Sequence, residues 1–179
     1  MTQPPGRALV ALGANVPFGE LQGPAMLAAA LARMQDAGFT LIACSSVWQT
    51  APWPPSEQPS FYNAVAAFDV EKRTPQDVFE RMREIESGLG RVRRERWGPR
   101  TLDLDLLDLD GLVGTFGEIT LPHPRLQERA FVLAPLMEIA PDWRHPELGK
   151  SVGEMLAGLS GGQKAERLGP IPLPGRSEV

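Results

Sequence analysis

The order in which strand-like and helix-like segments follow one another limits most strongly what this chain can fold into. Residues 7–13 (RALVALG) form a short apolar run that ends in glycine, which is typical of a strand. Residues 21–38 are rich in Ala and Leu and end in glycine, which favours a helix. Residues 39–49 and 61–71 are apolar enough for two further strands. The loop between these two strands contains four prolines in ten residues, so it can be neither helix nor central strand.

A second helix and a fourth strand follow. Thr74 and Pro75 are typical of a helix start, because threonine caps the first turn and proline suits its first position. Apolar residues in 78–89 then repeat every three or four positions and give the helix one apolar face. Residues 101–109 alternate between polar and apolar, as a half-buried strand does. The resulting order, β-α-β-β-α-β, predicts an α+β protein with a ferredoxin-like core, in which helices pack on one face of an antiparallel sheet.

The remaining segments predict a C-terminal extension of this core. Residues 118–121 suit a short strand, and residues 131–139 and 151–159 suit two further helices. We therefore expect residues 7–159 to form a single domain. Residues 160–179 hold four Gly and three Pro without apolar periodicity, which predicts a poorly ordered tail.

Composition and charge exclude several classes of protein. The net charge of −4 and the pI near 5.3 argue against a dedicated nucleic-acid or membrane-surface binder. No uncharged apolar stretch is long enough to span a bilayer, and no signal-peptide pattern opens the sequence. Cys44 is the single cysteine, which favours a reducing compartment. We expect a cytoplasmic monomer that acts on small molecules, with neither nucleic acid nor membrane as a partner.

The densest group of charged residues lies between residues 91 and 105. Five arginines fall within ten residues, and Asp103 and Asp105 follow directly. In a strand these two aspartates point to the same face, with Cα atoms about 6.5–7 Å apart, while the neighbouring leucines face the core. Two carboxylates at this spacing can hold divalent cations, and guanidinium groups beside them suit a polyphosphate. The pattern points to a magnesium nucleotide.

The phosphates of such a nucleotide would have to be held without a glycine-rich loop. The sequence has neither the P-loop motif nor the dinucleotide-binding motif. It also holds only three lysines. Arginine and metal are therefore the groups expected to bind the phosphates.

Each motif also has a purely structural interpretation. Surface arginines and aspartates can simply pair with each other, and a lone acidic pair is better explained in that way. His123, between two prolines, can be a capping or packing residue. Phe61 and Asn63 share one face of a predicted strand, where they can stack on a flat heterocycle and read its edge. The structural explanation is preferred for His123 alone and for the pair Phe61 and Asn63 alone. The aspartates and arginines together favour a functional site.

Taken together, the motifs resemble the 6-hydroxymethyl-7,8-dihydropterin pyrophosphokinase family of folate biosynthesis. The most specific match is RWGPRTLDLDLL at residues 96–107. The other matching stretches occur in the same order as in the family: residues 11–15 (ALGAN), 58–64 (QPSFYNA), Glu86 with 90–93 (GRVR), and LPHPR with RAFVL in 121–133. The resemblance covers nearly all of residues 8–159.

The resemblance implies a reaction and a set of site residues. The family transfers a pyrophosphoryl group from ATP to the hydroxymethyl group of the dihydropterin and releases AMP. Two Mg²⁺ ions would be held by Asp103 and Asp105, which would be catalytic together with Arg91, Arg93 and Arg100. The residues implied to bind ATP are Glu86, Arg91, Arg93, Arg100, Leu106 (through its backbone), Thr120, His123 and Arg129. The residues implied to bind the pterin are Thr50, Trp53, Phe61, Asn63 and Phe131, with the two phenylalanines on either side of the ring.

Two other functions stay open on the residues alone. A nucleotidyl transferase of the same fold would explain the aspartates but would leave Phe61, Asn63 and Phe131 without a role. A non-enzymatic module that binds RNA or another ligand would explain the arginines, but the acidic net charge disfavours it. For the pyrophosphokinase we predict direct in-line transfer with no covalent enzyme intermediate, because phosphoryl transfer needs alignment and charge stabilisation more than covalent work.

Overall fold

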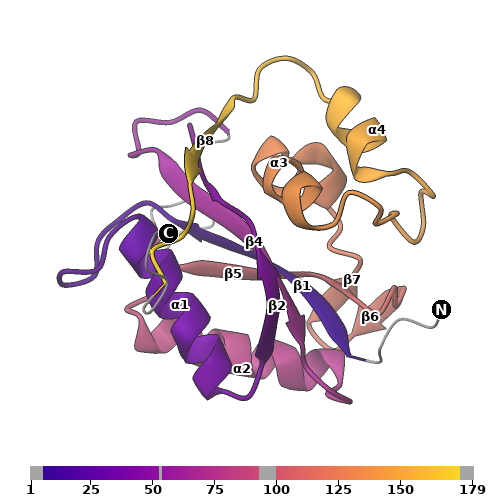
Figure 1. Cartoon of the computed structure of the whole chain (residues 1–179), viewed down its shortest axis with the longest axis horizontal. Helices are drawn as coiled ribbons and strands as arrows, with labels where there is room; N and C mark the ends of the chain where they lie inside the picture. The colour runs from indigo at the N-terminus through magenta and orange to yellow at the C-terminus, as the bar shows by residue number, and fades with distance from the viewer. Residues whose placement is uncertain (1–5, 53, 93–99, 174–179) are drawn as a thin grey trace, which may run out of the picture.

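An antiparallel sheet runs through the middle of the molecule, with helices on both of its faces (Figure 1). The computed structural model describes residues 6–52, 54–92 and 100–173. Its elements, in chain order, are β1 (Arg7–Ala14), α1 (Pro24–Asp36), β2 (Thr40–Cys44), β3 (Val47–Thr50), β4 (Phe61–Asp69), α2 (Pro75–Gly88), β5 (Asp103–Leu109), β6 (Gly114–Phe116), β7 (Ile119–Leu121), the 3-10 turn η1 (Leu126–Glu128), α3 (Ala130–Ile139), α4 (Val152–Ala157) and β8 (Ala165–Gly169).

Strand β1 is an inner strand of the sheet, with β4 on one side and β5 on the other, both antiparallel to it. The sheet order is β5-β1-β4-β3-β8, and β2 also pairs with β4. Helix α1 connects β1 to β2 and β3 across β4, and helix α2 connects β4 to β5 across β1. This interleaving of two split β-α-β units is the ferredoxin-like arrangement. The predicted fold class is confirmed.

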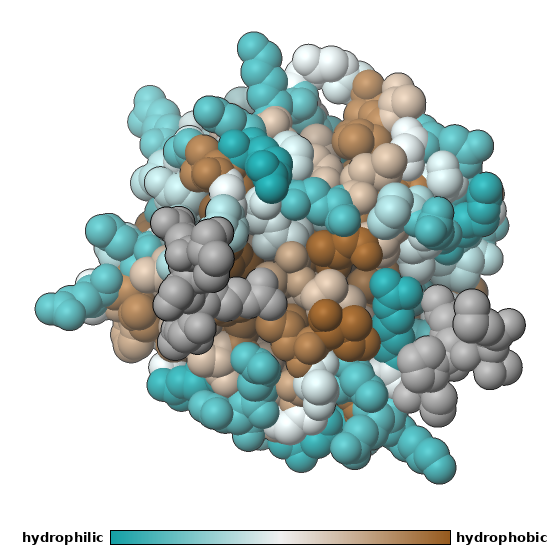
Figure 2. Space-filling view, viewed as in Figure 1, coloured by the Kyte–Doolittle hydropathy of each residue, from teal (hydrophilic) through white to brown (hydrophobic). Residues whose placement is uncertain are grey.

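Both faces of β1 are buried, because the strand is apolar on each. Ala8 and Val10 belong to the core that the sheet forms with α1 and α2. Leu9 and Ala11 point the other way, into a second core with α3 and α4. The predicted packing of α1 and α2 on one face is correct, and the C-terminal extension supplies the helices that cover the other. On the side of the molecule shown in Figure 2, apolar residues gather near the middle and hydrophilic residues surround them.

The strand predicted over residues 39–49 is in fact two strands, β2 and β3, which break at Ser45 and Ser46. The Ser45 hydroxyl accepts a hydrogen bond from the Val65 amide of β4 (3.0 Å) and donates one to the Ser46 carbonyl (2.8 Å). A hydroxyl thus takes the place of a backbone group in the ladder, and the pairing register with β4 shifts between β2 and β3. The break directs β3 toward the start of β4.

The C-terminal segment differs from the prediction of a poorly ordered tail. Within its described part, residues 160–173, strand β8 pairs antiparallel with β3. Beyond this strand Ile171 is only 5% exposed and belongs to the core with α1 and α2. The sequence pattern missed β8 because the strand is short and largely exposed, and its partner is distant in the sequence. In the described part of the chain, no helix is both long and apolar enough to cross a membrane.

Candidate active site

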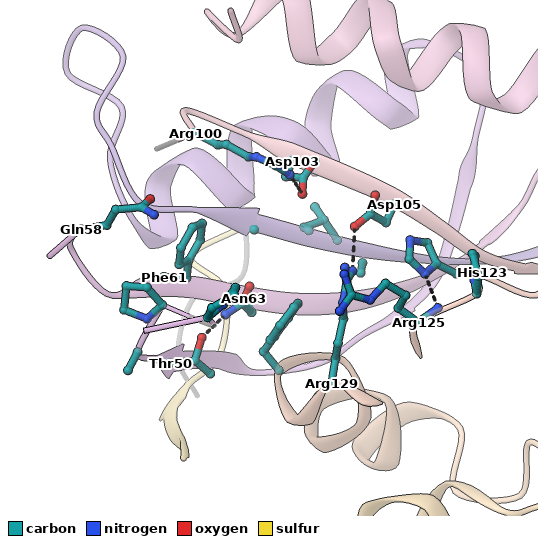
Figure 3. Close-up of a pocket in the computed structure, with 18 residues that line it drawn as sticks. Thr50, Gln58, Phe61, Asn63, Arg100, Asp103, Asp105, His123, Arg125 and Arg129 are labelled. Carbon is teal, nitrogen blue, oxygen red and sulfur yellow. Dashed lines mark hydrogen bonds and ion pairs between the residues drawn. The ribbon is translucent and has the colours of Figure 1, made fainter. Parts of the chain in front are cut away.

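A cleft of about 350 Å³ lies where the ends of β1, β3, β4 and β5 meet the start of α3 (Figure 3). Most of the residues singled out in the sequence line this cleft: Thr50, Phe61, Asn63, Arg100, Asp103, Asp105, His123, Arg129 and Phe131. The others come from β1, the proline-rich loop and the turn before η1: Ala11, Leu12, Gly13, Ala51, Pro52, Pro54, Gln58, Pro124 and Arg125. Segments that are far apart in the sequence therefore form one site.

The two aspartates share one face of β5, as their spacing predicted. Asp103 pairs with Gly13 of β1, and Asp105 pairs with Ala11. These small partners leave open space beside the carboxylates. Gly13 has a further constraint, because a Cβ atom there would lie 2.9 Å from the Asn63 amide oxygen. The leucines on either side of the aspartates face the core with α1 and α2, which also confirms the predicted alternation.

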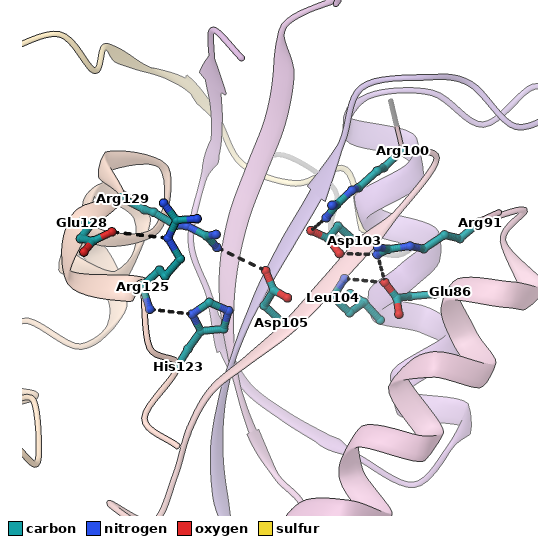
Figure 4. A network of polar contacts seen from close by, with 10 residues as sticks. All are labelled: Glu86, Arg91, Arg100, Asp103, Leu104, Asp105, His123, Arg125, Glu128 and Arg129. Atoms are coloured by element: carbon teal, nitrogen blue, oxygen red, sulfur yellow. Dashed lines mark hydrogen bonds and ion pairs between the residues drawn. The ribbon is translucent and has the colours of Figure 1, made fainter. Parts of the chain in front are cut away.

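Asp103 lies in a partly buried ion network (Figure 4). It pairs with Arg91 and with Arg100, and Arg91 also pairs with Glu86. Glu86 is 2% exposed and accepts a hydrogen bond from the Leu104 amide (3.2 Å). Burial opposes ionisation of Asp103, but the charges and hydrogen bonds of the two arginines outweigh it and hold the pKa of this carboxyl below its usual value. Asp103 is therefore ionised at neutral pH.

Asp105 has a different environment. Its ion pair with Arg129 is long, at 3.8 Å between Nη1 and Oδ2. Burial, with a further contribution from the charge of Asp103, raises the pKa of Asp105 to about 7. The long ion pair compensates the Asp105 carboxylate only weakly, and a cation bound beside it would favour its ionised form.

The donor set fits Mg²⁺. Magnesium prefers oxygen ligands and usually keeps several waters, binding through one or two carboxylates plus substrate phosphates. Asp103 and Asp105 supply two such carboxylates on one strand face. Among the described residues no cluster of three or more His, Cys, Asp or Glu side chains is arranged to hold a metal ion. An ion at this pair would complete its coordination with phosphate oxygens and water.

His123 is held against β5 and is neutral. Its backbone amide donates to the Leu107 carbonyl (2.8 Å), and its Nδ1 accepts from the Arg125 amide (3.2 Å). Burial, together with the positive charge of Arg129, lowers the pKa of His123 to about 4. With Nδ1 acting as an acceptor, Nε2 carries the proton and can donate a hydrogen bond without adding charge.

Phe61 and Asn63 lie at the other end of the cleft from His123 (Figure 3). Asn63 is 5% exposed, and its Nδ2 donates to the Thr50 hydroxyl (2.7 Å). This bond fixes the orientation of the Asn63 amide. The guanidinium carbon of Arg129 lies 5.5 Å from the centre of the Phe131 ring. The arrangement suits a flat, polar-edged ring beside a polyphosphate.

Several residues implied by the resemblance do not line the cleft. Glu86 and Arg91 lie behind Asp103: Arg91 forms ion pairs with both carboxylates, and only Asp103 of the three lines the cleft. The Leu106 side chain is buried in the core. Thr120 is exposed on β7, with its hydroxyl 3.4 Å from that of Thr115. Trp53 and Arg93 lie outside the described residues.

Asn15 belongs to one of the matching stretches, but no role was predicted for it. Its Oδ1 accepts from the Arg100 amide (2.8 Å). Its Nδ2 donates to Gln58 Oε1 (3.1 Å) and to the Pro59 carbonyl (3.2 Å). Asn15 thus joins the end of β1, the proline-rich loop and the segment that leads into β5. Spacing alone could not reveal this, because the partners are distant in the sequence.

Comparison with known proteins identifies the family. The model of the 7,8-dihydro-6-hydroxymethylpterin-pyrophosphokinase (HPPK) family matches residues 9–141. The chain belongs to this family. It is 42% identical over 154 residues to the 2-amino-4-hydroxy-6-hydroxymethyldihydropteridine pyrophosphokinase of Methylorubrum extorquens, covering 86% of this chain and 93% of that protein. The protein of the same name from Pseudomonas aeruginosa is 41% identical over 151 residues, covering 84% and 90%.

Solved HPPK-DHPS structures share the fold. A Plasmodium falciparum HPPK-DHPS chain superposes with a TM-score of 0.65 at 10% identity, covering 84% of this chain and 45% of that one. An HPPK-DHPS in complex with substrates has a TM-score of 0.65 at 12% identity, covering 87% and 43%. The present chain thus spans less than half of those longer chains, and at this identity the similarity shows a shared fold. The predicted family and enzyme class, a diphosphokinase of folate biosynthesis that uses small-molecule substrates with ATP as co-substrate, are confirmed by the family match.

Proposed function

We propose that this HPPK chain transfers the terminal diphosphate of ATP to the hydroxymethyl group of 6-hydroxymethyl-7,8-dihydropterin and releases AMP. The bond between the β-phosphorus and the oxygen that bridges it to the α-phosphorus breaks, and that oxygen leaves with AMP. A new bond forms from the β-phosphorus to the hydroxymethyl oxygen, which releases its proton to water. One observation carries the proposal: a single cleft joins two carboxylates, arginines and an aromatic-amide group. These are the groups needed for a metal-bound polyphosphate and a pterin side by side.

Asp103 and Asp105 are proposed to hold two Mg²⁺ ions. Bound there, the metal would neutralise phosphate charge and make a coordinated hydroxyl easier to deprotonate. The support is chemical: both side chains offer oxygen donors on one strand face, and the raised pKa of Asp105 marks a site that would gain from a cation.

The cations of the cleft are proposed to hold the phosphates. Arg100 lies beside Asp103 and Arg129 lies beside Asp105, so guanidinium groups flank the carboxylate pair. Neutral His123 can add an N–H donor to a phosphate oxygen. Glu86 and Arg91 are proposed to act from behind, by holding Asp103 in place. Roles for Arg93, Leu106 and Thr120 rest on the family resemblance.

The opposite end of the cleft is proposed to bind the pterin. Phe61 and Phe131 supply aromatic surfaces, and Asn63 with Thr50 supplies a fixed polar edge. Trp53 is included through the family resemblance. With both substrates in one cleft, the side chains mainly align the reacting atoms, and Arg100 and Arg129 stabilise charge that moves toward the leaving AMP.

The test is to incubate the protein with MgATP and the pterin and to follow the nucleotide products by chromatography. We expect AMP in equal amounts with pterin diphosphate. Asp105→Asn should lower kcat at saturating Mg²⁺ by about 100-fold or more. The variant loses a carboxylate that would hold Mg²⁺, and with it the stabilisation that the metal gives to the transition state. Asp36→Asn makes the same chemical change at an exposed position of α1 and should match the parent protein.

Other outcomes would point elsewhere. Release of inorganic pyrophosphate would indicate nucleotidyl transfer. Label from ATP retained covalently on the protein would contradict direct in-line transfer. Full activity of Asp105→Asn would contradict the proposal that Asp105 holds Mg²⁺. The monomeric state, the cytoplasmic location and the single domain over residues 7–159 stay predictions.

A further inference from the structure

The start of α3 has no capping side chain of its own. Arg129 occupies the N-cap position, and its guanidinium cannot accept a hydrogen bond from the first turn. The cap comes instead from Gln163 in the C-terminal segment. Its Oε1 accepts from the Ala130 amide (3.0 Å), and its Nε2 donates to the Glu128 carbonyl (2.8 Å). One side-chain amide therefore binds the backbone on both sides of Arg129.

This contact is directly connected to the cleft. Arg129 and Phe131 flank Ala130, and both line the cleft. The Arg129 guanidinium reaches Asp105, and it also lies over the Phe131 ring. Ala130 itself is 7% exposed, so water cannot easily replace the Gln163 oxygen at its amide, whereas the bond to the Glu128 carbonyl is exposed. Without the clamp, the backbone that carries both cleft residues would lose two hydrogen bonds.

The position of Gln163 is fixed by the sheet. Strand β8 begins two residues later, and Ala165 pairs with Thr50 of β3, another cleft residue. A smaller hollow of about 140 Å³ lies between Gln163, Phe131 and Pro52. The segment before β8 is therefore part of the wall behind the pterin end of the cleft. It also lies beyond residue 141, where the match to the family model ends.

We propose that Gln163 is a positioning residue for substrate binding. By clamping the backbone around Arg129, it holds this guanidinium and the Phe131 ring in place before either substrate binds. Preorganisation of this kind strengthens binding because less order has to be imposed when the ligand arrives. The inference rests on the proposed function, in which Arg129 contacts ATP and Phe131 contacts the pterin.

The test compares two variants of Gln163 with a matched control. Gln163→Met keeps the length of the side chain but removes both hydrogen bonds. Gln163→Glu keeps an acceptor for the Ala130 amide and loses the donor. Glu166→Met places the same new side chain at an exposed position of β8. The probes are an ATP analogue with a methylene group between the α- and β-phosphates, given with Mg²⁺, and oxidised 6-hydroxymethylpterin.

We expect Gln163→Met to weaken binding of both probes about tenfold in calorimetry, the scale set by one or two lost hydrogen bonds. Hydrogen exchange of the Ala130 amide should accelerate in the same variant. The affinity of Gln163→Glu for the probes should lie between those of Gln163→Met and the parent protein. The affinity of Glu166→Met should match that of the parent. A purely structural role would lower the unfolding free energy without changing the affinity of the folded protein.

Parent-like affinity of folded Gln163→Met would overturn the proposal, and so would equal losses in Glu166→Met. Failure of the proposed function has a different signature. In that case the unmodified protein forms no AMP from the pterin, whereas the exchange of the Ala130 amide still reports on the clamp. If Gln163→Met does not fold, intermediate binding by Gln163→Glu supports the clamp, and parent-like binding by Gln163→Glu contradicts it.

Discussion

At the scale of single residues, the site combines side chains that the sequence could assign with one that it could not. Alternation along β5 was sufficient to place Asp103 and Asp105 together, because strand periodicity is a local property. The hydrogen bonds of Asn15 connect three segments that meet only in the folded protein. Local periodicity carries no information about such contacts, and this is why the role of Asn15 emerged from the structure alone.

Asn15→Leu replaces the amide by an apolar group of similar size. The variant leaves the Arg100 amide and the Gln58 side chain without this partner, so Arg100 should lose its fixed position beside Asp103. We expect kcat/KM for ATP to fall about tenfold and the unfolding free energy to fall by about 1–3 kcal/mol. Steady-state kinetics and urea unfolding measure the two effects. Gln35→Leu, at an exposed position of α1, is the control and should change neither.

At the scale of elements, local signals predicted the helices well and the strand edges poorly. The helix start at Thr74 is confirmed in detail, since its side chain and that of Asp77 form a reciprocal capping box. The break between β2 and β3 depends on the contact between Ser45 and β4, so no run of residues within the segment revealed it. Strand β8 was missed because its pairing partner, β3, is distant in the sequence.

The turn that leads into α4 makes a pH-dependent contribution to stability. His145 is 3% exposed, and its Nδ1 accepts from the amides of Glu147 and Leu148. Burial lowers the pKa of His145, with the charge of Glu147 opposing this. At this histidine the unfolded chain therefore binds more protons below about pH 6.5, so the contribution of His145 to the unfolding free energy should rise with pH up to that value and then level off.

The predicted measurement is urea unfolding between pH 5 and pH 7.5. His145→Asn keeps an acceptor near the position of Nδ1 but cannot be protonated in this range, so the dependence on pH should become shallower. Arg144 and Glu154 lie nearby, as their ion pair shows, and are unchanged in the variant. An unchanged slope in His145→Asn would assign the pH dependence to other groups, such as His123.

At the scale of the whole molecule, the end of the described chain returns to the main core. Ile171 is 5% exposed beside the residues of α1 and the sheet, and Leu173 packs against the same core. Ile171→Ala should lower the unfolding free energy by about 2–5 kcal/mol, the cost of a cavity in a packed core. Leu168→Ala removes a comparable side chain that is 45% exposed and should cost far less. Equal losses in denaturant unfolding would mean that Ile171 does not contribute to the core.

The position of β1 between β4 and β5 also has a consequence for the synthesis of the protein. This strand leaves the ribosome before both of its neighbours, because β4 and β5 follow later in the chain. Until residue 109 has emerged, at least one edge of a strongly apolar strand has unpaired N–H and C=O groups, which are a template for pairing with other chains. The nascent chain is thus most open to aggregation while residues 15–109 are being made, and its yield depends on the speed of translation through them or on a chaperone that covers β1.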